Sequence, residues 1–271
     1  MSAKLRNTLL YLLLTLFALT ALIPFLWMAL TSFKPLEEVE KLNPVPTVWH
    51  PENYRKVFEQ ISFARYYFNS LFIAAWVTFL TCLTSSMAAF AFARLQWRQC
   101  DNVFRLYLAT LMIPGVVTMI PNYTLMVKLH LLDSYTGLIV PSAFSAFGTF
   151  LLRQFLLTIP SALDEAAEID GANKWQLFWD VILPLARPGL ITLALFTFMG
   201  NYGSFFWPLV MIKSEHLRTL PTGMLFFDST YGRQTNLLMA ASLMNIVPLI
   251  VLFIASQKFL VRGIQMGAVK G

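Results

Sequence analysis

The side chains best able to carry chemistry gather in residues 158–188, between two long apolar runs. Four carboxylates stand close together there, on Asp164, Glu165, Glu168 and Asp170. Ionised carboxylates on one short helix can form charge-assisted hydrogen bonds with basic groups of another protein. No nucleophile with an adjacent base and no metal-ligand spacing accompanies them, so the chemistry expected of this segment is ion pairing rather than catalysis.

The residues around these carboxylates predict two short helices joined by a sharp reversal. Ser161 is a candidate N-cap, and Asp164 follows three residues later in a near match to a capping box. Acidic residues in the early turns suit the positive end of the helix dipole. Gly171 fits the left-handed position that follows a helix, and Asn173 can cap the second helix.

The second predicted helix carries an apolar face at the spacing i, i+3, i+4, i+7. The face consists of Trp175, Phe178, Trp179 and Ile182. Pro184 is expected to end this helix, and Pro188 precedes the next apolar run. On the first helix, the small Ala166 and Ala167 leave room for a partner surface, so the segment is interpreted as a stiff knob. The alternative is an amphipathic hairpin that only lies along a membrane interface.

The elements that must position this segment are strongly apolar. The chain has 271 residues, 57% of them apolar and 13% charged, with a mean hydropathy of +0.63. Soluble domains are about 45–50% apolar and about 25% charged, so the excess apolar surface must face lipid. The net charge of +6 comes from short loops and does not form a nucleic-acid-binding stripe. We predict a single integral membrane domain over residues 1–271.

Six stretches are long enough to cross a hydrocarbon core as helices, which needs about 20 apolar residues each. They cover approximately residues 9–32, 68–93, 104–127, 137–157, 189–212 and 238–260. The first is too long for a signal peptide and is interpreted as a retained span. Kinks are expected around Pro114 and Pro121. Six spans place both termini on one side, and a weak excess of Lys and Arg in the short loops indicates the cytoplasm.

Several function classes are excluded by what the sequence lacks. It contains no Gly-Lys dipeptide and therefore no Walker A phosphate cradle. His50, His130 and His216 fall in three different predicted outer loops, without metal-ligand spacing, and Cys82 and Cys100 give no disulfide framework. We therefore expect no cofactor and no metal. The span interiors hold essentially no ionisable residue, so a proton-coupled carrier and a membrane enzyme are disfavoured, and energy for uphill transport must come from another chain.

The acidic segment resembles a known motif, the EAA loop of ABC-importer permeases. That pattern is E-A-A, three residues, Gly, nine residues, then I-x-L-P. Six residues match it at the right spacing: Glu165, Ala166, Ala167, Gly171, Leu183 and Pro184. Val181 replaces the first residue of the last element, which is a mild change.

The resemblance extends over the whole chain, to sugar-importer permeases of the maltose-system inner subunit type. The similar segments are Pro24–Trp27, Ser32–Lys34, Pro51–Tyr54, Asn69–Ser70, Ala88–Arg94, Met112–Pro114, Trp207–Leu209 and the tail Gln257–Gly271. One departure is Tyr202–Phe205, where the family often has Trp-Asn-Asp/Glu-Phe. The family's usual sugar contacts are therefore not expected to transfer to this span. Phe205 and Phe206 could stack on a sugar ring, but packing in the core or against lipid explains them better.

The resemblance implies an all-α integral membrane protein with six transmembrane helices, the type I ABC-importer permease fold, and a cytoplasmic coupling helix. It also implies a bacterial inner-membrane location and three kinds of partner: a second homologous permease, two ATPase subunits and an extracytoplasmic solute-binding protein. The implied ATPase-coupling residues are Asp164, Glu165, Ala166, Ala167, Asp170, Gly171, Leu183 and Pro184. A carbohydrate is the implied substrate class. A non-sugar solute, or a carrier that works without an ATPase, remains an alternative.

Overall fold

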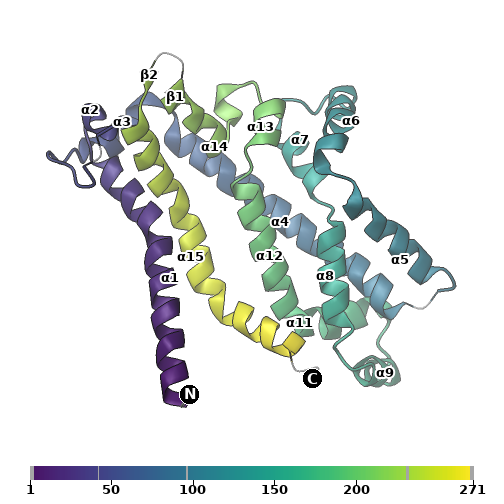
Figure 1. Ribbon diagram of the computed structural model, residues 1–271. Coiled ribbons are helices and arrows are strands. Elements are labelled where there is room, and N and C mark those ends of the chain that lie inside the picture. The colour runs from purple at the N-terminus through teal and green to yellow at the C-terminus, as the bar shows by residue number, and fades with distance from the viewer. Residues whose placement is uncertain (1–2, 42, 96, 230–231, 269–271) are drawn as a thin grey trace. The chain divides into compact units, whose positions relative to one another are not determined.

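The computed structural model describes residues 3–41, 43–95, 97–229 and 232–268. The chain is almost entirely helical in these ranges (Figure 1). The elements of the first half are α1 (Ala3–Ser32), α2 (Leu36–Val39), α3 (Glu52–Gln60), α4 (Phe63–Arg94), α5 (Cys100–Ala109), η1 (Thr110–Met112), α6 (Gly115–Lys128), α7 (Tyr135–Ile139), η2 (Val140–Ser142) and α8 (Ala146–Leu156). Those of the second half are α9 (Ala162–Ile169), α10 (Lys174–Gln176), η3 (Leu177–Ile182), α11 (Leu183–Leu185), α12 (Arg187–Tyr202), α13 (Phe206–Met211), η4 (Glu215–Leu217), α14 (Leu220–Gly223), η5 (Met224–Phe227), β1 (Asp228–Ser229), β2 (Gly232–Arg233) and α15 (Thr235–Ala268).

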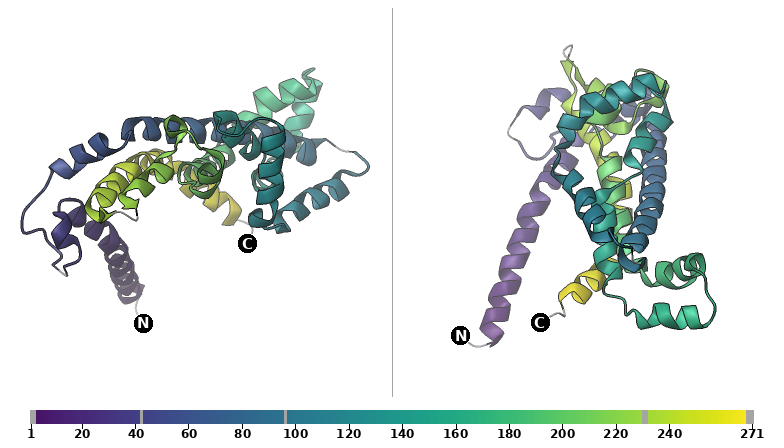
Figure 2. Two further views of the ribbon diagram at one scale, coloured as in Figure 1. Left: turned by 90° about the horizontal axis from the view of Figure 1, so that it is seen from above. Right: turned by 90° about the vertical axis from the view of Figure 1, so that its right-hand side faces the viewer.

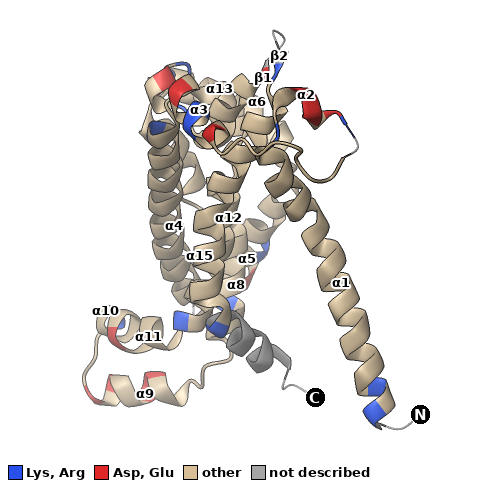
Figure 3. Ribbon diagram, turned by 90° about the vertical axis from the view of Figure 1, so that its left-hand side faces the viewer, with Lys and Arg blue, Asp and Glu red and all other residues tan. Residues whose placement is uncertain are grey.

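Among the described residues, three helices are long and apolar enough to cross a membrane by themselves, over Lys4–Ser32, Phe63–Arg94 and Thr235–Lys258. Three bent helix pairs bring the number to six if each pair is one span. The pairs are Cys100–Met112 with Gly115–Lys128, bent by 96°, Tyr135–Ser142 with Ala146–Leu156, bent by 42°, and Lys174–Leu185 with Arg187–Tyr202, bent by 75°. Figure 3 shows the middles of α1, α4 and α12 without charged residues, as a lipid-embedded segment requires.

The bent pairs differ from the predicted continuous spans for local reasons. Ile113 is extended, with φ −82° and ψ 115°, because the following Pro114 excludes the helical conformation. The expected break at Pro114 is therefore present, whereas α6 continues through Pro121. In the fourth stretch, the Ser145 side chain accepts a hydrogen bond from Gly148 N and starts a new helix. The predicted span 189–212 begins in the second half of the third pair, whose first half belongs to the acidic segment 158–188, and it is interrupted between α12 and α13.

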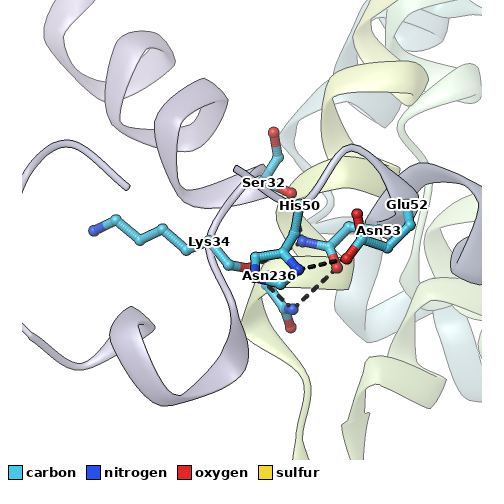
Figure 4. A network of polar contacts seen from close by, with 6 residues as sticks. All are labelled: Ser32, Lys34, His50, Glu52, Asn53 and Asn236. Carbon is cyan, nitrogen blue, oxygen red and sulfur yellow. Dashed lines mark hydrogen bonds and ion pairs between the residues drawn. The ribbon is translucent and has the colours of Figure 1, made fainter. Parts of the chain in front are cut away.

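The chain divides into two compact units, residues 1–65 with 223–247 and residues 66–222 with 248–271. In the first unit, a polar network joins the end of α1 to the starts of α3 and α15 (Figure 4). Asn53 Nδ2 donates to Ser32 O and Lys34 O, each at 2.9 Å, and Asn236 Nδ2 donates to Lys34 O at 3.2 Å. The Lys34 ammonium is fully buried and donates to Asn43 O at 2.6 Å. Buried polar groups are tolerated when hydrogen-bonded in this way, so the network fixes this end of the unit.

The second unit is built on α4, which contacts two apolar clusters. The cluster near the start of α4 contains Ile73, Val77, Met126, Leu138, Met211, Ile212 and Leu217. Beside it, fully buried Asn69 donates to His216 O at 3.0 Å and Arg218 O at 2.8 Å, and accepts from Tyr135 Oη at 2.7 Å. The cluster near the end of α4, here called the anchor cluster, contains Ala89, Phe90, Leu152, Leu156, Leu177, Phe178, Ile182, Ala186 and Leu193. The anchor cluster joins α4, α8 and α12 to the acidic segment between α8 and α12.

Candidate functional site

Residues 158–188 form a helical hairpin, here called the hairpin, which projects past the end of α8 (Figure 2). Its first arm is α9, and its second arm runs through α10, η3 and α11. The two arms pack on each other where α9 meets η3. Two short helices and a reversal were predicted here, and the structure confirms that arrangement.

The reversal depends on Gly171, which lies in the left-handed region with φ +86°. Gly171 N donates to Glu168 O at 3.0 Å, and Ala172 N donates to Ala167 O at 2.9 Å. These bonds satisfy carbonyls that the end of α9 would otherwise leave open. A Cβ at position 171 would meet nothing within 4 Å, so glycine is favoured here by backbone conformation rather than by space.

Of the two predicted helix caps, the structure contains the one at Asn173 and lacks the one at Ser161. The Asn173 side chain accepts from Trp175 N and Gln176 N, and the Gln176 side chain accepts from Asn173 N, which completes a capping box. The Ser161 cap was wrong, because Ser161 has helical angles, φ −66° and ψ −21°, and its side chain makes no capping bond. The backbone carbonyl of Ser161 instead accepts from Asp164 N at 2.9 Å.

The second arm differs from the predicted apolar face because η3 is a π-helix. Its wider turn buries Leu177, Phe178 and Ile182, each at most 2% exposed. Trp175 and Trp179, which belong to the predicted face, are 61% and 46% exposed. Pro184 does not end the helix, since it lies in the first turn of α11, where its missing N–H costs little.

The second arm is held by the anchor cluster. Phe178 lies against Phe90 of α4, with ring centroids 5.3 Å apart. Ala167 of the first arm and Leu183 of the second are partly buried against the same cluster. Fully burying a side chain of phenylalanine size stabilises by roughly 1.5–3 kcal/mol, so the hairpin is fastened to α4, α8 and α12 by packing.

The first arm is held to α4 by a charged contact. Arg94, the last residue of α4, lies with its Nε 3.0 Å from Asp164 Oδ2, and its Nη2 donates to Ile159 O at 2.9 Å. Both side chains are largely buried, at 8% and 15% exposure. Burial raises the pKa of Asp164, and the attraction of the Arg94 guanidinium only partly opposes that rise.

The eight predicted coupling residues divide between two sides of the hairpin. Glu165, Ala166, Asp170 and Gly171 are exposed, whereas Asp164, Ala167, Leu183 and Pro184 are partly buried. The exposed side also carries Leu163 and Ile169, which are 41% and 87% exposed. Sequence reasoning missed both, because they are ordinary helix residues. Arg94 was not among the predicted coupling residues, because sequence alone does not show that it lies beside a distant carboxylate.

The hairpin exposes acidic and apolar side chains on one side and packs against the anchor cluster on the other. Within the described residues, no group of three or more His, Cys, Asp or Glu side chains is placed to hold a metal ion. The fold supports the same interpretation. The sequence over residues 1–265 matches the family described as "Binding-protein-dependent transport system inner membrane component".

This chain belongs to that family of transport permeases. Two permeases of known systems are similar in sequence to this chain over most of its length. The permease is 34% identical to the arabinooligosaccharides transport system permease protein AraQ of Halalkalibacterium halodurans, over 94% of this chain and 93% of the relative. It is 36% identical to the sn-glycerol-3-phosphate transport system permease protein UgpE of Yersinia pestis, over 72% and 70% of the two chains.

Solved structures place the permease fold among ABC importers. A chain of a bacterial ABC transporter involved in the import of the acidic polysaccharide alginate matches with a TM-score of 0.83, at 24% identity, over 96% of this chain and 99% of that one. A chain of the MetNI methionine ABC transporter in an inward-facing conformation matches with a TM-score of 0.51, at 18% identity, over 75% and 92%. The predicted type I ABC-importer permease fold is therefore confirmed, and the permease is a multi-pass membrane component of a transporter.

Proposed function

We propose that the permease carries a carbohydrate inward across the cytoplasmic membrane and that the hairpin receives the movement of a separate ATPase subunit. The observation that carries the proposal is the hairpin's construction. Its outer side exposes Glu165, Ala166 and Asp170, while its inner side is fixed to α4, α8 and α12 by the anchor cluster. A surface that is open to a partner and rigid behind can transmit a displacement to the spans.

The proposed coupling residues act in two ways. Glu165 and Asp170 offer carboxylates to basic groups of the ATPase. Ala166 lies beside exposed Ile169, and its small side chain lets a partner approach the helix closely. Asp164, Ala167, Leu183 and Pro184 support the frame from inside, and Gly171 makes the reversal between the arms. Coupling requires that these contacts differ between the ATP-bound and ATP-free states of the partner.

The proposed assembly contains a second homologous permease, two ATPase subunits and an extracytoplasmic binding protein. Alternating access between the two sides of the membrane would follow from rigid-body movement of the spans. Because the hairpin must meet a cytoplasmic ATPase, both termini are proposed to lie in the cytoplasm. In the tail, residues 269–271 lie outside the described residues, as do the side chains from position 259 onward, so the tail resemblance remains a prediction.

A carbohydrate is the proposed substrate because relatives similar over most of the chain are named for arabinooligosaccharides and for sn-glycerol 3-phosphate. Both are polyhydroxylated molecules. The test is to purify the tagged permease under gentle conditions, identify the chains that accompany it, and reconstitute the complex in liposomes. Uptake is then measured with oligosaccharides, glycerol 3-phosphate and, as a non-carbohydrate control, an amino acid.

We expect ATP-dependent uptake of one carbohydrate when its binding protein is present. Uptake by the permease alone without ATP would contradict the dependence on an ATPase and support a self-sufficient carrier. Uptake of the amino acid alone would contradict the substrate class while leaving the coupling mechanism intact. If no ATPase subunit copurifies with the permease, that result would count against the proposed assembly.

A further inference from the structure

We propose that Arg94 is a positioning residue that makes the first arm of the hairpin and helix α4 move as one body during transport. The inference rests on the proposed coupling function and adds to it a specific mechanical link outside the motif. Arg94 lies far from the hairpin in sequence, 70 positions before Asp164. It is the last residue of a 32-residue helix that is long enough to cross the membrane.

The contact geometry connects one guanidinium to two points of the first arm. Arg94 Nη2 donates to Ile159 O, where the chain enters the hairpin, at 2.9 Å. Arg94 Nε lies 3.0 Å from Asp164 Oδ2, in the first turn of α9. A planar guanidinium spreads its charge over three nitrogens and suits such a two-point contact, whereas a lysine ammonium would act as a single point charge.

Burial makes this contact more consequential than a surface ion pair. Arg94 and Asp164 are 8% and 15% exposed, so each charge has lost most of its hydration. Removing one member of a buried pair leaves the other charge uncompensated, which is a severe penalty. The two side chains do not form every hydrogen bond that they could, however. Arg94 Nε is not aligned for a hydrogen bond, and Asp164 Oδ1 is buried without a hydrogen-bond partner among the described residues. The link therefore depends on charge attraction and on the bond to Ile159.

The second arm reaches the same helix through a different contact. Phe178 packs on Phe90, which lies one turn before Arg94 on α4. A force on α9 thus has a charged route to the end of α4, and a force on η3 has an apolar route to the turn before it. With both routes present, α4 follows the hairpin. Without the charged route, the first arm is held by the apolar contacts of Ile159 and Ala167 with the anchor cluster and by its packing on η3, which let it shift more easily relative to α4.

The carboxylates and ammonium around Asp164 do not replace this link. Glu168 and Glu165 are like charges, and Lys174 pairs with Glu168 through side chains that are both about half exposed. Arg98, four residues after Arg94, is exposed and has the same charge. Arg98 is therefore the matched control for a neutralised arginine at this end of α4.

The first experiment compares Arg94→Gln, Arg94→Lys and Arg98→Gln in the complete reconstituted complex. For Arg94→Gln we expect ATP hydrolysis to persist while substrate uptake per ATP falls by about tenfold, within the usual range of coupling between sites. Arg94→Lys should lie between wild type and Arg94→Gln, and Arg98→Gln should match wild type. Unchanged uptake per ATP in Arg94→Gln would overturn the inference. Equal losses of assembly, hydrolysis and uptake would also overturn it, since they indicate a general structural role.

A second experiment replaces the charged link by a covalent one. Arg94→Cys and Asp164→Cys are combined in a chain where Cys82 and Cys100 are serine, and the pair is joined by a short bifunctional thiol reagent. We expect poor uptake per ATP before joining and recovery after it, because the arm and α4 never need to separate. Uptake that stays low or falls further after joining would contradict the inference. A wild-type complex that hydrolyses ATP but imports no carbohydrate would instead refute the proposed substrate. Coupling in the variants would then be measured as the increase in ATP hydrolysis when the binding protein is added.

Discussion

Gly148 of α8 lies directly against Ser85 of α4, and a Cβ on Gly148 would stand 2.6 Å from Ser85 Oγ. The same Cβ would stand 3.0 Å from Leu193 Cδ1 on α12. The three helices that support the hairpin therefore meet at a point where a methyl group would require the side chains of Ser85 and Leu193 to shift. Small residues allow membrane helices to approach this closely.

The first prediction follows from that contact. Gly148→Ala should lower the thermal stability of the purified permease, because overpacking costs about 1–3 kcal/mol. Gly200→Ala on α12 is the control, since a Cβ there meets nothing within 4 Å and alanine favours a helix. Adding Ser85→Gly should recover part of the loss. Equal stability of the two alanine variants would show that the helices can move apart freely.

The second prediction concerns the reversal in the hairpin. Gly171→Val should reduce uptake strongly, because a β-branched residue at φ +86° strains the turn by about 1–2 kcal/mol or more. Gly171→Asn should retain much more uptake, because asparagine tolerates the left-handed region. Membrane insertion, measured by fractionation, should be the same in both. If valine and asparagine behave alike, side-chain size rather than backbone conformation matters at this position.

The third prediction tests which aromatic side chains anchor the second arm. Phe178→Ala should destabilise the hairpin by about 3–5 kcal/mol, as expected when a buried phenylalanine is truncated. Trp175→Ala should have a much smaller effect, since Trp175 is 61% exposed. Limited proteolysis of the hairpin reports the difference. Faster cleavage in the tryptophan variant than in the phenylalanine variant would contradict the packing described for η3.

The fourth prediction concerns pH and the loop between α6 and α7. Hydrogen bonds from the Ser214 side chain and backbone, together with one from Lys213 N, lower the pKa of Asp133. A lowered folded-state pKa means that ionised Asp133 contributes stability above its unfolded pKa, about 3.9. That contribution is lost as the pH falls through the folded-state pKa. Asp133→Asn, which also tolerates the observed φ of 54°, should thus be less stable than wild type at neutral pH and equal to it in strong acid. A stability difference that does not change with pH would contradict the role of the charge.

The sequence predicts the hairpin well where a single residue dictates a local conformation. Gly171 and Asn173 behave as expected because a left-handed turn and a capping box are decided within a few residues. Pro114 breaks its helix for the same reason.

The incorrect predictions share a different cause, which is contact with distant segments or an uncommon helix form. The apolar face of the second arm was predicted with a period of 3.6, whereas the π-helix buries Leu177, and Trp175 in the preceding α10 is exposed. The contact of Arg94 with Asp164 joins positions that only the tertiary structure brings together. A sequence offers no local signal for either feature.

The 96° bend at Pro114 has a consequence for hydration. The 14 residues of α6 rise only about 21 Å, less than a hydrocarbon core of about 30 Å, so a single span made of both halves has its corner inside the bilayer. The first N–H groups of any helix lack partners within that helix, and lipid tails offer none. The corner that begins at Gly115 must therefore be wetted or covered by polar groups, although neighbouring Met112 and Val116 are 84% and 80% exposed in the isolated chain.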